Sequence, residues 1–184
     1  MGDRRRPTWV RTAAAITALT LALGSWCGGD EPALARVETA FIYNFTQFVE
    51  WPAAAFPGKD APFVVAIVGE DPFAGALEQA MAGKLASGRP IVVRHYASAE
   101  RIEGYQLLFV PEAQDDAVAA ILAKAAGRPI LTVGQSDAFM RGGGAVRLFV
   151  EDGHMKFQID PDVVDASKLK ASAKLMKLAR IYRK

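Results

Sequence analysis

The sequence predicts an α/β domain, a three-layer sandwich whose mostly parallel, flavodoxin-like sheet carries an added C-terminal β-hairpin. Two continuous apolar runs, 63–68 and 106–110, have the length and composition of strands that are buried on both faces. Helical patterns separate such runs, which favours parallel strands joined by helices. Near the C-terminus, an Asp-Gly pair at 152–153 lies between two further strand-like segments and indicates a tight hairpin turn.

The first 35 residues are typical of a secretory signal peptide. Four arginines lie within residues 1–11, and the apolar run at 12–23 is too short to span a bilayer comfortably. The small residues Ala33 and Ala35 then provide a cleavage site, and we expect cleavage after Ala35. The remaining residues, 36–184, have the size of a single domain.

The single cysteine bears on the export route and on whether the exported domain can form a disulfide. The chain has one cysteine, Cys27, which follows the apolar run. A lipoprotein would be lipidated there, but Trp26 stands where a small residue is needed, so the lipoprotein is the less favoured alternative. Because Cys27 leaves with the signal peptide, the exported domain can form no disulfide and must be held together by packing.

An aromatic segment at 37–52 opens the domain and predicts a helix. Pro52 disfavours helical geometry at the residue before it, so the helix is expected to end near Glu50 or Trp51. The residues expected to pack on the sheet share one helical face and are Phe41, Phe45, Phe48 and Val49. Ile42, Tyr43 and Trp51 point elsewhere on the helical wheel. They are either buried by other parts of the fold or available as contacts for a partner, since Tyr and Trp are enriched in interface hot spots.

The middle of the chain alternates between strands and helices. After the strand at 63–68, Asp71 and Pro72 are typical of an N-cap and a first helical residue, which predicts a helix over 72–81. Ser136 and Asp137 are expected to cap one short helical turn. The elements expected in between and after are strands at 91–94, 106–110 and 129–133, and helices at 115–126 and 138–141.

The C-terminal part is expected to contain the hairpin and then a basic helix. The hairpin strands are 145–150 and 154–159, and Asp160-Pro161 begins a helical turn. Residues 168–184 hold seven basic residues and no acidic one, and a single helix is expected from Ser167 to about Tyr182. The stripe expected to dock is Leu175, Leu178, Ala179 and Tyr182. The residues expected to stay exposed, and to attract an acidic partner domain or anionic lipid headgroups, are Lys170, Lys174, Lys177 and Arg180.

No catalytic, metal or cofactor motif stands out in the sequence. The two histidines, His95 and His154, are far apart and lack the close-spaced ligands that a metal site needs. The segment 134–138 follows a strand as a nucleophile elbow would, but its second glycine is replaced by Ala138. Helix capping by Ser136 explains the same pattern, and we therefore predict a protein that is not an enzyme.

A ligand loop is the second kind of site that the pattern allows. Residues 69–73 lie where a strand gives way to a helix, at the carboxyl end where open α/β sheets bind ligands. Glu70 and Asp71 would repel an anion, so these residues and Phe73 are candidates for contacting a cationic or neutral small ligand. Capping of the following helix is the alternative. The glycines at 142–144 precede a strand and favour a flexible turn over a phosphate cradle.

Several stretches, taken together and in order, resemble the YfiR family of periplasmic proteins. They cover nearly all of the expected domain. The matching stretches are AFIYNFTQFVEWP (40–52), VVAIVGEDPF (64–73), GRPIVVR (88–94), GRPILTV (127–133), FMRGGGAVRLFVEDGHMKFQID (139–160) and KLKASAKLMKLAR (168–180).

The resemblance implies a periplasmic regulator that acts by binding. The resemblance implies a repressor of an inner-membrane diguanylate cyclase. Such a repressor binds the exported domain of the cyclase and keeps cyclic-di-GMP synthesis low. An outer-membrane lipoprotein can sequester it. Many members carry a cysteine at the position of Tyr105, so disulfide control is not expected here. No catalytic residue is carried over by the resemblance.

The sequence therefore predicts a periplasmic signalling regulator whose partner is the exported domain of an inner-membrane diguanylate cyclase or sensor kinase. The alternative is a periplasmic small-ligand-binding module of a receptor system. Nucleic-acid binding is not expected, because the chain resembles an exported protein and its basic tail lacks interleaved aromatic residues. A homodimer is left open.

Overall fold

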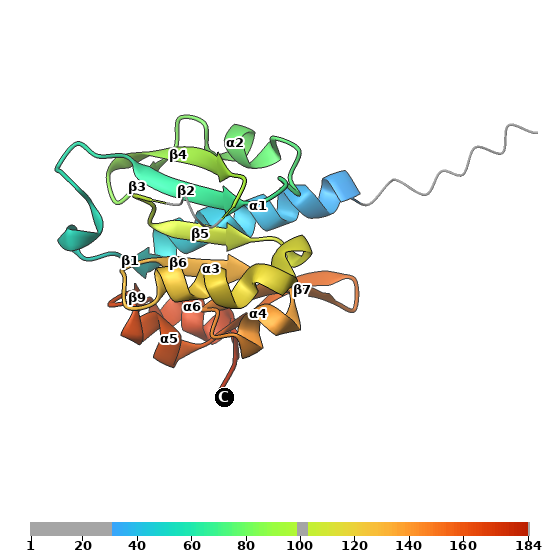
Figure 1. The fold of residues 1–184 in the computed structure, drawn as a ribbon. Helices are drawn as coiled ribbons and strands as arrows, with labels where there is room; N and C mark the ends of the chain where they lie inside the picture. Colours follow the sequence, from blue (N-terminus) through green and yellow to red (C-terminus); the bar gives the residue numbers. More distant parts are fainter. Residues whose placement is uncertain (1–30, 99–102, 184) are drawn as a thin grey trace, which may run out of the picture.

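The computed structural model describes residues 31–98 and 103–183, and its centre is an eight-stranded sheet in the order β10-β8-β7-β6-β5-β2-β4-β3 (Figure 1). A separate two-stranded sheet joins β1 (Val49–Glu50) to β9 (Lys170–Ala171). The strands of the large sheet are β2 (Phe63–Val68), β3 (Leu85–Ala86), β4 (Arg89–Tyr96), β5 (Leu107–Val110), β6 (Leu131–Gly134), β7 (Val146–Glu151), β8 (His154–Ile159) and β10 (Arg180–Ile181).

The strand directions agree with the predicted α/β class. β4, β2, β5, β6 and β7 run parallel, while β8 returns antiparallel to β7 as the second strand of the predicted hairpin. The first strand of the parallel set, β2, lies between the second and the third, which is the order expected from the sequence. A mostly parallel sheet with an added hairpin is therefore confirmed, whereas the closer likeness to a flavodoxin-like sandwich stays a prediction.

Helices cover both faces of this sheet. Along β2, Val65 and Ile67 pack in the cluster that contains α1 and α2, whereas Val64 and Ala66 pack in the cluster that contains α3 and α4. This alternation explains why β2 reads as an unbroken apolar run. The helices are α1 (Glu31–Phe48), α2 (Ala76–Met81), α3 (Val118–Ala125), α4 (Asp137–Arg141), α5 (Pro161–Ala166) and α6 (Ala173–Leu178), with 3-10 turns at Ala53–Ala55 and Glu112–Ala117.

The aromatic helix α1 ends earlier and is rotated relative to the prediction. It stops at Phe48, and Val49 pairs with Ala171 in the β1–β9 sheet. The fully buried residues of this segment are Ile42 and Phe45 in α1 and Val49 in β1, all at most 3% exposed. Phe41 and Phe48 are partly buried and pack against the same core cluster, so the expected face does turn inward, with its centre shifted towards Ile42.

Helix α2 begins at Ala76 and not at Pro72, because the chain first makes a tight turn. The Asp71 carboxylate accepts hydrogen bonds from the backbone N–H groups of Phe73 and Gly75, each at 2.8 Å. Ala74 and Gly75 have φ values of 48° and 83°, which a right-handed helix cannot include. Asp71 thus caps a turn that precedes the helix.

The single basic helix predicted for the tail is wrong. Ser172 caps the short helix α6 by accepting from the Leu175 N–H, and the chain then pairs as β10 with the edge of β8. An unpaired strand edge offers backbone partners that a longer helix would leave unused. Leu175 docks as expected, but Leu178 is 71% exposed.

The remaining turn and cap predictions are confirmed. Ser136 accepts a hydrogen bond from the Phe139 N–H at the start of α4, and Asp160 accepts from Asp162 and Val163 at the start of α5. The hairpin turn has positive φ at both of its central residues, 53° and 72°, as a two-residue Asp-Gly turn requires. Among the helices in the described part of the chain, none combines the length and apolar character that a membrane span needs.

Candidate functional site at the carboxyl edge of the sheet

The loops that follow β2, β5, β6 and β7 all lie at one edge of the sheet, because these strands are parallel. Ligands of open α/β sheets bind outside the carboxyl ends of the strands. Two hollows lie at this edge, of about 540 and 470 Å³. Leu34 and Glu38 of α1 and Gln135 after β6 line both, so the hollows form one carboxyl-edge cleft.

Glu38 and Gln135 form the polar contact that the two hollows share. The Gln135 side-chain amide donates to Glu38 at 2.9 Å, and its carbonyl accepts from the Glu112 N–H at 3.3 Å. Glu38 is only 6% exposed. Burial raises the pKa of its carboxyl above the ordinary value, and the hydrogen bond from Gln135 opposes this shift.

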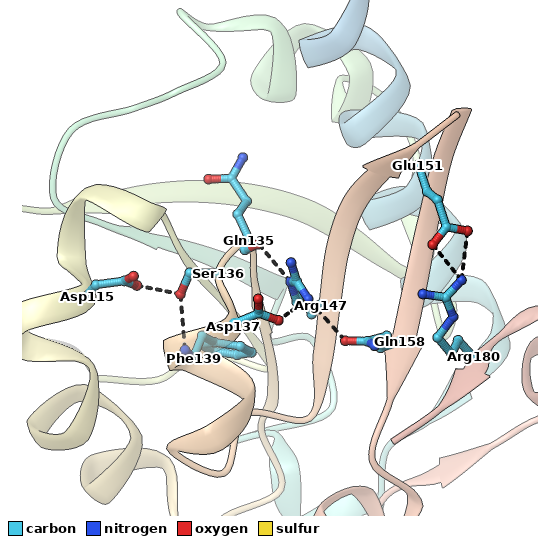
Figure 2. Close-up of polar contacts among 9 residues, drawn as sticks. All are labelled: Asp115, Gln135, Ser136, Asp137, Phe139, Arg147, Glu151, Gln158 and Arg180. Carbon is cyan, nitrogen blue, oxygen red and sulfur yellow. Dashed lines mark hydrogen bonds and ion pairs between the residues drawn. The ribbon is translucent and has the colours of Figure 1, made fainter. Parts of the chain in front are cut away.

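Ser136 is engaged in hydrogen bonds that hold the start of α4. Figure 2 shows its hydroxyl donating to Asp115 while it accepts from the Phe139 N–H. Its acidic partner replaces the basic histidine that a serine nucleophile needs. His154 instead lies at the start of β8, where its ring contacts the Asp152 carbonyl at 2.7 Å.

The hairpin projects from the same edge and carries a continuous polar and aromatic face. Cross-strand pairing sets Arg147 opposite Gln158 and Phe149 opposite Lys156. The Arg147 guanidinium donates to the Gln135 carbonyl at 3.0 Å and also pairs with Asp137, which ties the hairpin to the cleft (Figure 2). We call the following residues the hairpin face: Arg147, Phe149, Glu151, Lys156, Gln158 and Arg180.

Phe149 lies between two guanidinium groups on the hairpin face. Arg147 is 5.2 Å and Arg180 4.9 Å from the centre of its ring. Arg180 donates to both carboxylate oxygens of Glu151, at 2.8 and 2.7 Å (Figure 2). These hydrogen bonds, followed by the one from Lys156, lower the pKa of Glu151 to about 2. The face is therefore ordered before any partner arrives.

The residues predicted as partner contacts on the aromatic segment are largely used by the fold. Ile42 is completely buried, so it offers no surface to a partner in this structure. Trp51 is half-buried; its ring meets Phe63 edge-on at 4.8 Å, and its N–H donates to the Gln106 carbonyl at 3.0 Å. Tyr43 is half-buried, with the Lys84 ammonium 4.1 Å from its ring centre.

The predicted contacts of the basic tail are exposed. Lys170 lies in β9, while Lys174 and Lys177 lie on α6. Lys174 is 4.9 Å from the ring centre of Phe48. Arg180 belongs to the hairpin face, through its pairing with Glu151.

The predicted ligand-loop residues differ in accessibility. Glu70 is exposed, Asp71 is occupied in capping, and Phe73 is 2% exposed, packed against Phe109 and lining the larger hollow. The fold also brings Asp71 close to Glu78 and His95, with ligand atoms within 4.8 Å of one another. The Glu78 carboxylate and the His95 ring already contact each other at the surface.

Two groups of site residues escaped sequence reasoning. Glu38 precedes Ile42 by one helical turn, so a carboxyl on the buried stripe was a readable signal once the phase of that stripe was known. The hairpin face could have been read from the register that the Asp-Gly turn imposes. The meeting of Glu38 with Gln135, which are 97 residues apart, had no local signal.

Comparison with known proteins gives a family and a likeness of fold to solved structures. A sequence model of the family described as YfiR/HmsC-like matches residues 35–180. No curated protein matches the chain. Among solved structures, the chain is similar to a conserved domain protein from Vibrio cholerae O1 biovar El Tor, with a TM-score of 0.51 and 8% identity. The match covers 79% of this chain and 60% of that one, less than two thirds of its length, and it bears on the fold alone.

Proposed function

The chain belongs to the YfiR/HmsC-like family, and on that premise we propose that it is a periplasmic signalling regulator that binds the exported domain of an inner-membrane sensor. A diguanylate cyclase is the sensor proposed first and a sensor kinase second. Binding would repress cyclic-di-GMP synthesis by favouring one conformation of the sensor over another, since equal binding to both would regulate nothing.

Family membership carries this proposal, and the geometry of the carboxyl edge supports it. Ser136, the strongest nucleophile candidate, is bonded to an acid and caps a helix. A recognition protein needs an ordered surface with aromatic and arginine anchors, because such residues dominate interface energetics. The hairpin face provides Phe149 between Arg147 and Arg180, and the ion pair with Glu151 reduces the ordering cost of binding.

The proposed contact surface joins the hairpin face to the exposed lysines of the tail, Lys170, Lys174 and Lys177. Their charge favours an acidic patch on the sensor domain and would speed association at low salt. An outer-membrane lipoprotein that competes for this surface would relieve repression. The periplasmic location rests on the signal peptide predicted for residues 1–35, of which 1–30 lie outside the described residues.

A binding measurement with the exported domain of a diguanylate cyclase encoded beside this gene tests the proposal. Isothermal titration calorimetry should detect a complex with a Kd no weaker than on the order of tens of micromolar. Added regulator should also lower cyclase output in membranes that contain the full-length sensor. No heat at that concentration, with unchanged output, would contradict the proposed function.

A further inference from the structure

We propose that the larger hollow of the carboxyl-edge cleft binds a small organic monocation, an amine with a compact apolar body, whose ammonium group is held by Glu38. The proposal concerns the hollow of the cleft that lies next to the hairpin face, and it does not depend on the identity of the protein partner. It assigns a role to a buried acid that the proposed function leaves without one.

The first reason is that Glu38 has no structural task that explains its burial. Its hydrogen-bond partner in the described part of the chain is a side chain and not a backbone N–H, so it does not cap α1 (Glu31–Phe48). Within residues 31–98 and 103–183, no ion pair joins its carboxylate to a basic side chain. Its partner is the neutral amide of Gln135. A buried carboxylate with one neutral donor is costly to the fold, so an apolar or amide side chain would serve stability better.

The second reason is the shape and composition of the hollow around it. Its volume of about 540 Å³ lies in the range of small-molecule sites. Phe73, Ala74 and Ala76 supply an apolar wall, and Glu38 and Gln135 supply the polar end. Leu34 and Ala35, which also line the hollow, precede the expected cleavage site, whereas these five residues follow it and remain in the exported domain.

The third reason is charge. A cation would satisfy the carboxylate of Glu38 in a place where water is largely excluded, and opposite charges there favour the ionised carboxyl. Arg36 is the single basic residue that lines the hollow, and it is exposed at the rim. An anionic ligand would meet the buried carboxylate and be repelled, so the arrangement discriminates by the sign of the ligand charge.

Three probes of equal shape test this assignment: isopentylamine, isopentanol and isovalerate. Calorimetry and thermal shift on the purified protein at pH 7.5 should show that the amine binds, with a Kd on the order of 1 mM or tighter, and raises Tm. Isopentanol and isovalerate should bind at least about 10-fold more weakly, since hydrogen bonds to a charged group are worth roughly that much.

Two variants give the matched comparison. Glu38→Gln should weaken amine binding by about 10-fold or more, because it keeps the shape and removes the charge. Glu50→Gln removes the same charge from an exposed position at the end of the aromatic segment and should leave the amine Kd unchanged. Equal binding of the amine by wild type and Glu38→Gln, preference for isopentanol or isovalerate, or no binding at about 10 mM would each overturn the proposal.

A measurement on wild type covers the case in which Glu38→Gln fails to fold. Carbon-13 NMR of the Glu38 carboxyl should show that saturating isopentylamine lowers its pKa, whereas isopentanol leaves it in place. An unchanged Glu38 pKa with bound amine would place the amine elsewhere and overturn the assignment. None of these outcomes depends on whether a sensor domain binds the hairpin face.

Discussion

The aromatic segment of α1 and the hairpin of β7 and β8 differ from what their sequences indicate in how accessible their aromatic side chains are. The aromatic segment has the composition of a binding surface, yet Ile42 and Phe45 are completely buried. The hairpin shows an ordinary turn signal, yet it carries Phe149 between two arginines on a partly exposed face. Aromatic content alone therefore did not predict which aromatic side chains stay accessible, whereas register and charge pairing describe them.

This difference has a physical origin in what each element must cover. The α1 side of the sheet has to be sealed from water, and the largest side chains nearby are used for it, with Phe45 meeting Phe157 edge-on at 5.4 Å. The face of the hairpin that carries Phe149 meets α4 through the pair of Arg147 and Asp137, and Phe149 there stays partly exposed. The side chains of this face satisfy each other by ion pairs and cation–π contacts and remain accessible.

Truncating one phenylalanine from each region should show the largest contrast in stability. Phe45→Ala should lower the free energy of unfolding by about 3–5 kcal/mol, because it opens a cavity in the core. Phe149→Ala should cost about 1 kcal/mol, since the lost contacts are cation–π contacts at the surface. Urea denaturation measures both, and equal losses would remove the distinction between the regions.

Trp51 sharpens the comparison because it could belong to either role. Trp51→Phe removes the hydrogen bond to the Gln106 carbonyl but leaves that carbonyl a second donor, the Leu131 N–H. The expected loss is therefore only about 1 kcal/mol by urea denaturation, with unchanged partner affinity. A stable variant that loses partner binding would return Trp51 to the recognition surface.

The contribution of Glu38 to stability should depend on pH. Because burial raises its folded-state pKa above 4.5, the folded protein binds more protons than the unfolded chain, and stability falls as pH rises through this window. Glu38→Gln should therefore raise Tm at pH 8, and the gain should vanish below pH 4.5. Arg36 lines the same hollow, and Asp115 and Arg147 line the neighbouring one. These charged residues are left unchanged in the comparison, so that wild type and variant differ only at residue 38. A constant gain at all pH values would contradict this account.

The ion pair on the hairpin face should produce the smallest effect. Carbon-13 NMR titration of the Glu151 carboxyl should give a pKa of about 2, and Arg180→Gln should move this pKa back towards 4.5. A lowered pKa contributes stability above 4.5 that is lost as pH falls towards 2. Because the pair is exposed, salt should weaken it. A Glu151 pKa that ignores Arg180→Gln would show that the face is not ordered by this pair.

Much of the fold could be predicted from local patterns, and the failures share one cause. Asp160, Ser136 and the Asp-Gly turn have local chemistry, and each formed the expected cap or turn. The phase of α1 was predicted only approximately, because apolar residues crowd both of its faces and packing decides which of them are completely buried. The tail was misassigned because the free edge of β8, which pairs with β10, is invisible to helical periodicity.

The candidate site was predicted less completely, since its members come from distant parts of the chain. Phe73 does line the cleft, and Arg180 does lie on the hairpin face. The sequence indicates Gln135 only as part of an elbow-like motif, in contrast, because its hydrogen bonds with Glu38 and Glu112 depend on residues far away in the chain. Such contacts follow from strand order and helix phase together.

Partner binding by matched hairpin variants tests the central claim most directly. Phe149→Ala should weaken binding of the sensor's exported domain by about 10-fold or more, as expected for a buried aromatic anchor. Val150→Ala, on the same strand with its side chain on the other face, should change the Kd less than about twofold. A wild-type Kd for Phe149→Ala, measured on a folded variant, would contradict the assignment of recognition to the hairpin face.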